Sequence, residues 1–367
     1  MTFLLRASAS PGEVRIALTG GDGALHDYAI WRPGAPDGVG DVHCGRVIAR
    51  VPAMAGMFVS LASGEEGFLP DTKAGADLAS GALIGVRITR GAQGGKGPRL
   101  ERVYVPDTDL GRIARLAPGP SPLAELAAGH PEAPVLVDDL ALAAELRSTL
   151  GARVRYTPAA FDAVTEDAIA ALAEPAATIF GGVRAWFHPT PALTAIDLDT
   201  AGATEARAAK SLAQAALNRA VLPALARQIR LRNLSGAILV DFAGMKSRKR
   251  AALAPALSAA LAEDPLKPRL LGFTALGFAE ILRPRLRPPL HERQRGAHAA
   301  GLAALRALLA ECRHAPGRPP RLVASPAIVS ALEADQVARA DFTREAGREW
   351  RLASDPGLQE EGFRIEA

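Results

Sequence analysis

Two stretches of this 367-residue chain decide its fold: Leu193-Thr-Ala-Ile-Asp-Leu-Asp199 and Gly236-Ala-Ile-Leu-Val-Asp-Phe242. Each is a short apolar run with a carboxylate at its end, which favours a buried strand. The Ala-rich segment from about Thr204 to Arg232 lies between them and predicts a helix that is interrupted at Pro223. Strands that alternate with helices indicate an α/β sheet with helices packed on it. The same alternation continues with a helix over about Ser247 to Glu263 and a strand over Leu270 to Leu276.

The segment before this α/β region has a different pattern. Short apolar runs recur at spacings near ten residues, with glycines between them, in Met57-Phe-Val-Ser-Leu61, Gly67-Phe-Leu-Pro70 and Leu83-Ile-Gly-Val-Arg-Ile-Thr89. This spacing predicts a small closed β-barrel over about residues 41–100. Residues 1–38 read as short strands, residues 101–188 mix helix and strand with a helix over Leu140 to Leu150, and residues 300–367 read as a small α+β unit.

The overall composition excludes several classes of protein. Apolar residues make up 49% of the chain and charged residues 22%, which indicates a globular protein. No run of 18 apolar residues occurs and the first residues lack a secretory signal, so we expect a cytoplasmic protein without a membrane span. Two cysteines, Cys44 and Cys312, exclude a disulfide scaffold. The net charge of +4 permits a polyanionic partner without proving one.

Carboxylates stand where the strands of the α/β region end. Asp197 and Asp199 close the first strand and Asp241 closes the second. Carboxylates at one edge of a sheet can share Mg²⁺, which takes one or two of them together with water and substrate phosphate. The alternative is that Asp199 begins a turn and Asp241 caps the next segment. Asn218, in the intervening helix, could orient a metal-bound water or a phosphate, but from the residues alone a solvated helix position is favoured.

Basic residues gather in the sequence around Asp241. They are Arg227, Arg230, Arg232, Lys246, Arg248, Lys249 and Arg250. A carboxylate within a basic cluster suits a phosphodiester substrate, because the cations hold phosphates near the metal. The alternative is a solvated helical face. Five more arginines would extend the patch if they fold back onto it: Arg283, Arg285, Arg287, Arg293 and Arg295.

Two aromatic residues and a lysine mark the barrel segment. Phe58 and Phe68 lie ten residues apart, and Lys96 sits in a glycine-rich turn. Aromatic side chains on a basic barrel face stack on the bases of single-stranded nucleic acid. The alternative is that either phenylalanine belongs to the barrel core.

These stretches carry a resemblance to a known family. Ala192-Leu-Thr-Ala-Ile-Asp197, Ala226-Arg-Gln-Ile-Arg-Leu-Arg-Asn-Leu234, Ile238-Leu-Val-Asp-Phe242 and Leu276-Gly-Phe-Ala-Glu-Ile-Leu-Arg-Pro-Arg-Leu286 resemble the catalytic core of the ribonuclease E/G family. The front of the chain resembles the family's RNA-binding OB-fold in Cys44-Gly-Arg-Val47, Met57-Phe-Val59, Gly67-Phe-Leu-Pro70 and Lys96-Gly-Pro-Arg-Leu100.

The resemblance implies a multidomain α/β fold. An OB-fold barrel (39–100) would be inserted in an RNase H-like domain (1–38 and 101–188), followed by a DNase-I-like catalytic domain (189–295) and a small α+β domain (296–367). It also implies a Mg²⁺-dependent endoribonuclease acting on single-stranded RNA. Asp197 and Asp241 match the family's metal-binding aspartates, with Asp199 nearby. Asn218 falls at a family asparagine, and Phe58, Phe68 and Lys96 fall at RNA-contacting positions. Lys246, Arg248, Lys249 and Arg250 are expected to position the RNA.

The chain also departs from the family pattern. Asp199 stands where the family commonly has asparagine, and Gly244 replaces an acid that often follows the second aspartate. The Cys-Pro-x-Cys zinc link expected after Leu290 is absent, so we expect neither zinc nor a zinc-linked tetramer, while another homo-oligomer stays open. The chain between Leu100 and Thr190 is short, and we expect the 5′-sensor region to be missing from this compact member.

Two other functions compete with this interpretation. One is a non-catalytic protein of the same fold that only binds single-stranded RNA. The other is a metal-dependent phosphoesterase that acts on a small nucleotide and does not need the barrel phenylalanines.

Overall fold

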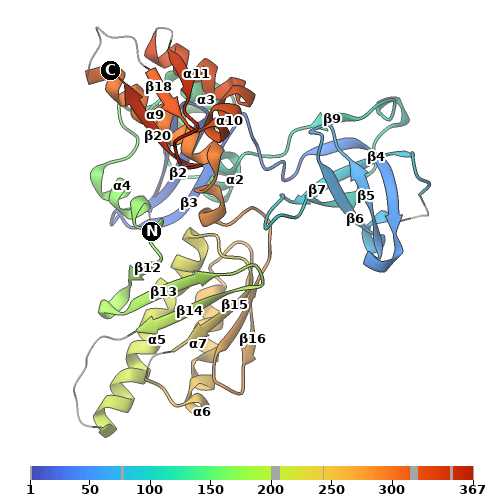
Figure 1. Ribbon diagram of the computed structural model, residues 1–367. Coiled ribbons are helices and arrows are strands. Elements are labelled where there is room, and N and C mark those ends of the chain that lie inside the picture. Colours follow the sequence, from blue (N-terminus) through green and yellow to red (C-terminus); the bar gives the residue numbers. More distant parts are fainter. Residues whose placement is uncertain are drawn as a thin grey trace.

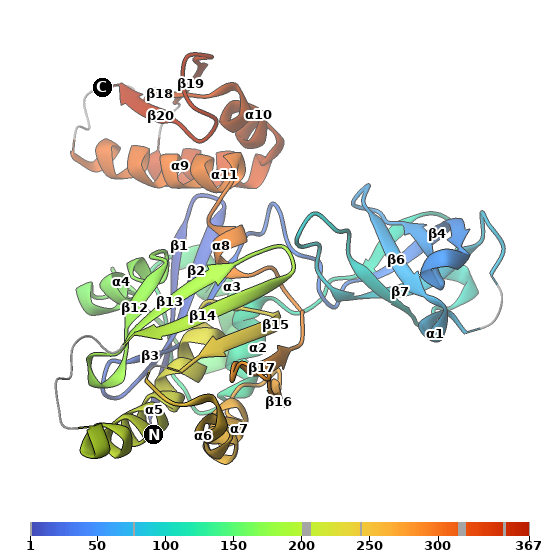
Figure 2. The ribbon, with the colours of Figure 1, turned by 60° about the horizontal axis from the view of Figure 1, so that its bottom comes forward.

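A computed structural model describes residues 2–75, 78–199, 207–242, 244–314, 321–347 and 350–366. The described chain forms four sheets (Figure 1). One of them closes into a barrel that stands away from the other three in both views (Figures 1 and 2). Within these residues no helix is long and apolar enough to cross a membrane.

The N-terminal sheet joins two segments that are distant in sequence. Its strand order is β11-β10-β1-β2-β3, in which β1 and β2 are antiparallel and β10 pairs in parallel with β1. Leu5, Ile16 and Val135 form part of its core. The strands are β1 (Phe3–Ser10), β2 (Glu13–Gly20), β3 (Leu25–Trp31), β10 (Val135–Val137) and β11 (Val154–Tyr156), and the helices beside them are α2 (Pro122–Gly129), α3 (Leu140–Leu150) and α4 (Ala163–Ala170).

Helix α3 has the bounds that the sequence predicts, because both ends carry strong signals. The Asp139 side chain accepts a hydrogen bond from the Leu142 backbone N–H at the N-terminus. Gly151 follows the last residue with a φ of 61°, a left-handed conformation that favours glycine.

The barrel predicted from the spacing of short strands is confirmed. Five strands close on themselves because β4 pairs with both β5 and β7, an arrangement consistent with an OB-fold. A sixth strand, β9 (Ala114–Ala117), extends the sheet beside β4. The barrel consists of β4 (Val42–Val51), β5 (Gly56–Ser60), β6 (Glu66–Pro70), β7 (Leu83–Arg90) and β8 (Arg99–Arg102), with the short helix α1 (Asp71–Ala74) after β6.

The third sheet contains the two stretches that open the sequence argument. Its order is β12-β13-β14-β15-β17-β16, and β14 and β15 are its parallel pair. Ile196, Leu198 and Val240 point to one face and share a buried core with residues of α5 and α7. The residues that alternate with them lie on the opposite face, called the open face below. The elements are β12 (Ala176–Thr178), β13 (Arg184–Pro189), β14 (Leu193–Asp199), α5 (Arg207–Leu231), β15 (Gly236–Asp241), α7 (Ala254–Leu261), β16 (Arg269–Phe273) and β17 (Ala279–Arg283).

Three details of this region differ from the sequence prediction. Helix α5 continues through Pro223 without interruption, since the fully buried Val221, Leu222 and Leu225 hold the helix against the sheet and offset the missing hydrogen bond. The helix expected over Ser247 to Glu263 is divided into α6 (Ser247–Arg250), a 3₁₀ turn (Ala251–Leu253) and α7. Strand β17 was not predicted from periodicity, and it pairs with both β15 and β16.

The C-terminal unit is α+β, as expected. It packs against the N-terminal sheet where Gly12 has a φ of 73°, and a Cβ built there would lie 2.5 Å from Cβ of Ala338. Only glycine permits this close approach. The unit consists of α9 (Ala297–His314), α10 (Pro326–Ala334), α11 (Gln336–Ala346) and the sheet of β19 (Arg351–Ser354), β18 (Arg321–Ala324) and β20 (Phe363–Glu366), preceded by α8 (Leu290–Arg293).

Candidate active site

Strand register brings two of the predicted carboxylates together. Asp197 on β14 is the Cα partner of Asp241 on β15 in a parallel ladder. Both side chains belong to the open face, because their neighbours Ile196 and Val240 are buried on the other side. Adjacent strands are separated by about 4.8 Å, so the two carboxylates start from neighbouring positions. Asp199 lies two residues further along β14 on the same face, exposed and opposite Arg184 of β13.

Arg250 holds the second of these carboxylates. Its Nη1 lies 2.5 Å from Oδ1 of Asp241, and the same guanidinium donates to the carbonyl oxygens of Met245 and Gly277. The Arg250 side chain is only 12% exposed, whereas that of Asp241 is 39% exposed. A charge-assisted bond of this kind fixes the orientation of the carboxylate. Arg250, predicted to bind RNA, therefore lies against Asp241 itself.

The other three predicted cations are exposed. Lys246 precedes α6, and Arg248 and Lys249 lie within it, directly after the loop that follows Asp241. A polyanion that reaches the carboxylates from this side meets positive charge first, which lowers the cost of bringing phosphates next to the aspartates.

Asn218 is fully buried in α5. The interpretation as a solvated helix position is therefore wrong. One turn earlier in the same helix, Gln214 is also buried, and a Cβ placed on Gly244 would lie 3.0 Å from its Cδ and Cγ. Gly244 has a φ of 65°. The glycine that replaces the family's acid thus adopts a backbone conformation that favours glycine, over a space that Gln214 fills.

The donor set fits Mg²⁺ better than a metal held by many protein ligands. Carboxylate oxygens are the ligands that Mg²⁺ prefers, and it is commonly bound by one or two carboxylates and completed by water and phosphate. Among the described residues, no group of three or more His, Cys, Asp or Glu side chains is arranged to hold a metal. Asp197 and Asp241, on neighbouring strands, are two carboxylates of the type that such a Mg²⁺ site uses.

The barrel brings together two of its three predicted residues, Phe58 and Phe68. Phe58 on β5 is the Cα partner of Phe68 on β6, and their rings meet edge to face with centroids 5.6 Å apart. Arg99 lies over the Phe68 ring, with Cζ 5.9 Å from its centroid. Both phenylalanines are half-buried, so neither belongs to the buried barrel core. Lys96 is exposed in the turn before β8, in which the Gly94 N–H donates to Glu292.

Several arginines expected near Asp241 lie elsewhere. Arg230 donates to the carbonyl of His26 on β3, and Arg232 donates to the carbonyls of Ala171, Leu172 and Glu174. Arg283 forms a buried ion pair with Asp264 at 2.7 Å. Arg287 pairs with Asp37 and Glu125, and Arg293 donates to the Ile30 carbonyl. Arg230 and Arg232 therefore do not join a cluster around Asp241, and Arg283, Arg287 and Arg293 do not fold back to extend one, because each of the five binds acceptors elsewhere.

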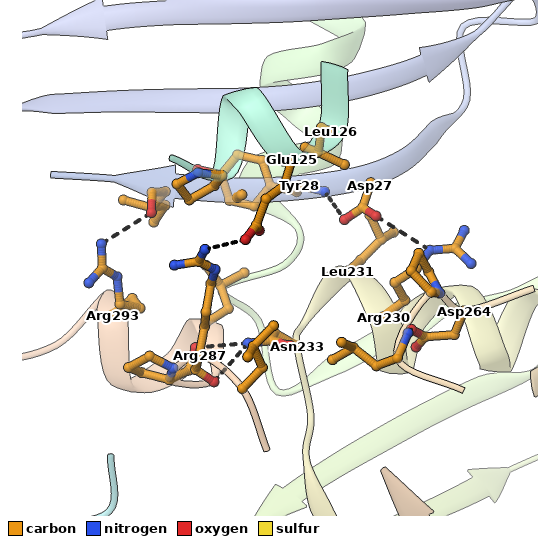
Figure 3. Close-up of a pocket in the computed structure, with 18 of the residues that line it drawn as sticks. Asp27, Tyr28, Glu125, Leu126, Arg230, Leu231, Asn233, Asp264, Arg287 and Arg293 are labelled. Carbon is orange, nitrogen blue, oxygen red and sulfur yellow. Dashed lines mark hydrogen bonds and ion pairs between the residues drawn. The ribbon is translucent and has the colours of Figure 1, made fainter. Parts of the chain in front are cut away.

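That junction contains a cavity of about 260 Å³ (Figure 3). It lies between β3, α2, the C-terminal end of α5 and the segment before α8. Burial raises the pKa of Asp27 to about 6, although the nearby Arg230 acts in the opposite direction. Asp197, Asp199, Asn218 and Asp241 do not line this cavity, whereas four of the arginines expected in the basic patch do: Arg230, Arg283, Arg287 and Arg293. Its ion pairs join the N-terminal sheet to the third sheet.

Sequence comparison links one part of the chain to a known family. Residues 141–286 match the model of the Ribonuclease E/G family, and this segment contains Asp197, Asp199, Asn218 and Asp241. Ribonuclease G of Escherichia coli K12 is 37% identical over 101 residues, which are 27% of this chain and 20% of that protein. Ribonuclease E of a Nostoc species is 34% identical over 106 residues, 29% of this chain and 15% of that protein. Ribonuclease G of Haemophilus influenzae is 31% identical over 128 residues, 34% of this chain and 26% of that protein.

Residues 141–286 of the chain are therefore similar to the ribonuclease E/G family. The alignments span only 15% to 26% of the length of these relatives. Alignments of this extent do not settle what the whole chain does.

Proposed function

We propose that this chain is a Mg²⁺-dependent endoribonuclease that cleaves single-stranded RNA in RNA processing or decay. One observation carries the proposal: Asp197 and Asp241 are register partners on an exposed sheet face, inside the segment that matches the ribonuclease family model. A pair of carboxylates that faces solvent beside exposed cations suits a reaction at a phosphodiester.

The proposed roles follow from position. Asp197 and Asp241 would hold Mg²⁺, with Asp199 adding negative charge nearby; when bound, the ion supplies a polarised water and neutralises charge that develops on the phosphodiester. Arg250 keeps the Asp241 carboxylate in place through their 2.5 Å contact. Lys246, Arg248 and Lys249 bind phosphates of the RNA. Asn218, buried in the helix that covers the other face of the sheet, would act only by positioning the strands that carry the carboxylates.

In this proposal the barrel binds the single-stranded RNA. Phe58 and Phe68 offer ring surface to bases, and Lys96 and Arg99 offer charge to phosphates. We also propose the division into an RNase H-like domain, an OB-fold and a DNase-I-like domain, which the separate sheets and their order support.

The test is cleavage of a labelled single-stranded RNA of about 15 nucleotides, a length that fills one barrel site and the open face. We expect cutting with Mg²⁺, none with EDTA, and a loss of roughly 100-fold or more in Asp241→Asn, which keeps an oxygen acceptor for Arg250 but loses the charge. Glu132→Gln, an exposed change near the end of α2, is the matched control and should cleave normally.

Two outcomes would redirect the proposal. Unchanged cleavage in Asp241→Asn would contradict the assigned site. Tight, salt-sensitive RNA binding without a product would favour a protein that only binds RNA.

Equal cleavage rates on 5′-monophosphorylated and 5′-hydroxyl RNA are expected, because the short stretch between Leu100 and Thr190 is proposed to lack the 5′ sensor.

A further inference from the structure

A row of three planar side chains lies on the open face of the third sheet. Arg184, Trp186 and His188 occupy alternate positions of β13, while Ala185 and Phe187 between them are buried on the other side. Cζ of Arg184 lies 4.4 Å from the centroid of the Trp186 ring. The rings of Trp186 and His188 are within 7° of parallel, with centroids 6.4 Å apart.

The row is adjacent to the candidate carboxylates. In the antiparallel ladder between β13 and β14, Trp186 is the Cα partner of Asp197 and Arg184 is the partner of Asp199. Cross-strand partners share a face of the sheet, with Cβ atoms about 5 Å apart. An RNA strand whose cleaved phosphodiester lies next to Asp197 and Asp241 therefore has a neighbouring nucleotide within reach of the row.

This row differs from a second arginine–aromatic contact on the same strand, which only supports the fold. On the covered side of the same strand, Arg232 lies 4.3 Å from the Phe187 ring centroid, but that arginine is buried and donates to four separate acceptors. Arg184 and His188 are exposed, and Trp186 is half-buried. Parallel rings in full face contact have atoms about 3.5 to 4 Å apart, so a centroid separation of 6.4 Å leaves part of each ring face uncovered.

We propose that this row, Arg184, Trp186 and His188, binds a nucleobase of single-stranded RNA by stacking, next to the phosphodiester that is cleaved. The inference rests on the proposed function and adds a base-binding position to it. Stacking accepts any base because each base has a π-face, and the Arg184 guanidinium adds cation–π attraction and a positive charge for the phosphate. A base within a duplex already stacks on its neighbours, so the row favours an unpaired strand.

The test combines substitutions at Trp186 with abasic sites in the RNA. Affinity is measured in EDTA, with intact RNA verified on a gel, for a 15-nucleotide strand and for versions that carry one abasic nucleotide at successive positions. For the wild-type protein, removal of the base at one position near the cleavage site should weaken RNA binding about tenfold. In Trp186→Leu the intact RNA should bind about tenfold more weakly, and removal of that same base should cost less than about twofold.

Two further variants separate stacking from a structural effect. Trp186→Phe, which keeps a ring, should recover most of the affinity and the sensitivity to the abasic position. Tyr156→Leu, an exposed aromatic residue on β11 in the N-terminal sheet, should behave as wild type in every arm. Thermal unfolding of each variant identifies any loss of folding.

The outcomes distinguish this inference from the proposed function. If the wild type neither binds nor cleaves RNA, the proposed function fails. The other outcome is that the wild type cleaves RNA, but each abasic nucleotide lowers RNA affinity by the same factor in wild type and in Trp186→Leu. The proposed function then stands and the stacking site is refuted.

Discussion

The ion pair between Arg250 and Asp241 is the most informative single contact of the candidate site. Three acceptors surround the guanidinium: the Asp241 carboxylate and the carbonyls of Met245 and Gly277. Arg250 therefore joins the end of β15, the loop after it and the turn between β16 and β17. A cation in this position orients Asp241, whereas its exposed neighbour Arg248 is available to solvent and ligand.

Arg250→Ala should impair the cleavage step, whereas Arg248→Ala should impair RNA binding. Arg250→Ala should lower kcat about 10- to 100-fold with little change in RNA affinity, because Asp241 loses the group that orients it. Arg248→Ala should leave kcat unchanged, weaken RNA binding and reduce the salt slope of log K by about one, since one phosphate contact is lost. Single-turnover cleavage and affinity at several salt concentrations measure both. If Arg250→Ala instead lowers only affinity, Arg250 acts as an RNA ligand.

Strands β5 and β6 show how an element builds a binding surface. The ladder places Phe58 opposite Phe68, and the edge-to-face pair covers the strands from outside the barrel core. Gly56 is necessary beside them, because a Cβ there would lie 2.4 Å from Cζ of Phe68. The ring of Phe68 is thus held between its partner phenylalanine, a glycine and Arg99.

Phe68→Leu should weaken RNA binding by about 1 to 3 kcal/mol through the loss of base stacking. The change keeps an apolar side chain, so the melting temperature of the barrel should move little. Tyr104→Leu, which replaces a fully solvated ring just after β8, is the matched control and should keep wild-type affinity. Fluorescence anisotropy with labelled RNA measures both. Equal affinities for Phe68→Leu and wild type would place the RNA elsewhere on the chain.

Buried ion pairs connect the parts of the whole molecule. Glu13 on β2 binds Arg32 at 2.8 Å and Arg306 of α9 at 2.7 Å, so one carboxylate joins the N-terminal sheet to the C-terminal unit. Burial raises the pKa of Glu13, but the guanidinium groups of Arg306 and Arg32 together outweigh it and hold that pKa below its usual range. Arg283 with Asp264, and Arg287 with Glu125, join other elements in the same way.

Glu13→Gln should destabilise the protein by about 3 to 5 kcal/mol at pH 7, because the buried Arg32 loses its counter-charge. The pKa of Glu13 is lower in the folded than in the unfolded chain, so the unfolded chain binds more protons in acid. The contribution of Glu13 is therefore complete above about pH 4.3 and is lost as the pH falls through the folded-state pKa. Thermal unfolding is followed from pH 7 to pH 3. Over this range Glu13→Gln should lose less stability than wild type or Glu132→Gln. An equally steep acid loss in Glu13→Gln would contradict the assignment.

The amino-acid sequence alone determined the elements with a strong local signal. The apolar runs ending at Asp199 and Phe242, the capped helix at Leu140–Leu150 and the evenly spaced barrel strands depend on periodicity and on turn or cap residues, which act within a few residues. The motifs around Asp197 and Asp241 were likewise sufficient to indicate the family. Strand β17 and the continuity of α5 through Pro223 were not predicted, since burial against the sheet outweighs the local preference there.

Only the tertiary structure decided which of these residues meet. Register made Asp197 and Asp241 neighbours and put Trp186 beside Asp197, because a strand pairs with residues remote in sequence. It also separated arginines that are close along the chain: Arg250 turns to Asp241, while Arg230 and Arg232 at the far end of α5 bind carbonyls of other segments. A charge cluster in sequence becomes a charge cluster in space only when its residues share a face, and the direction of each side chain is fixed by packing across the whole molecule.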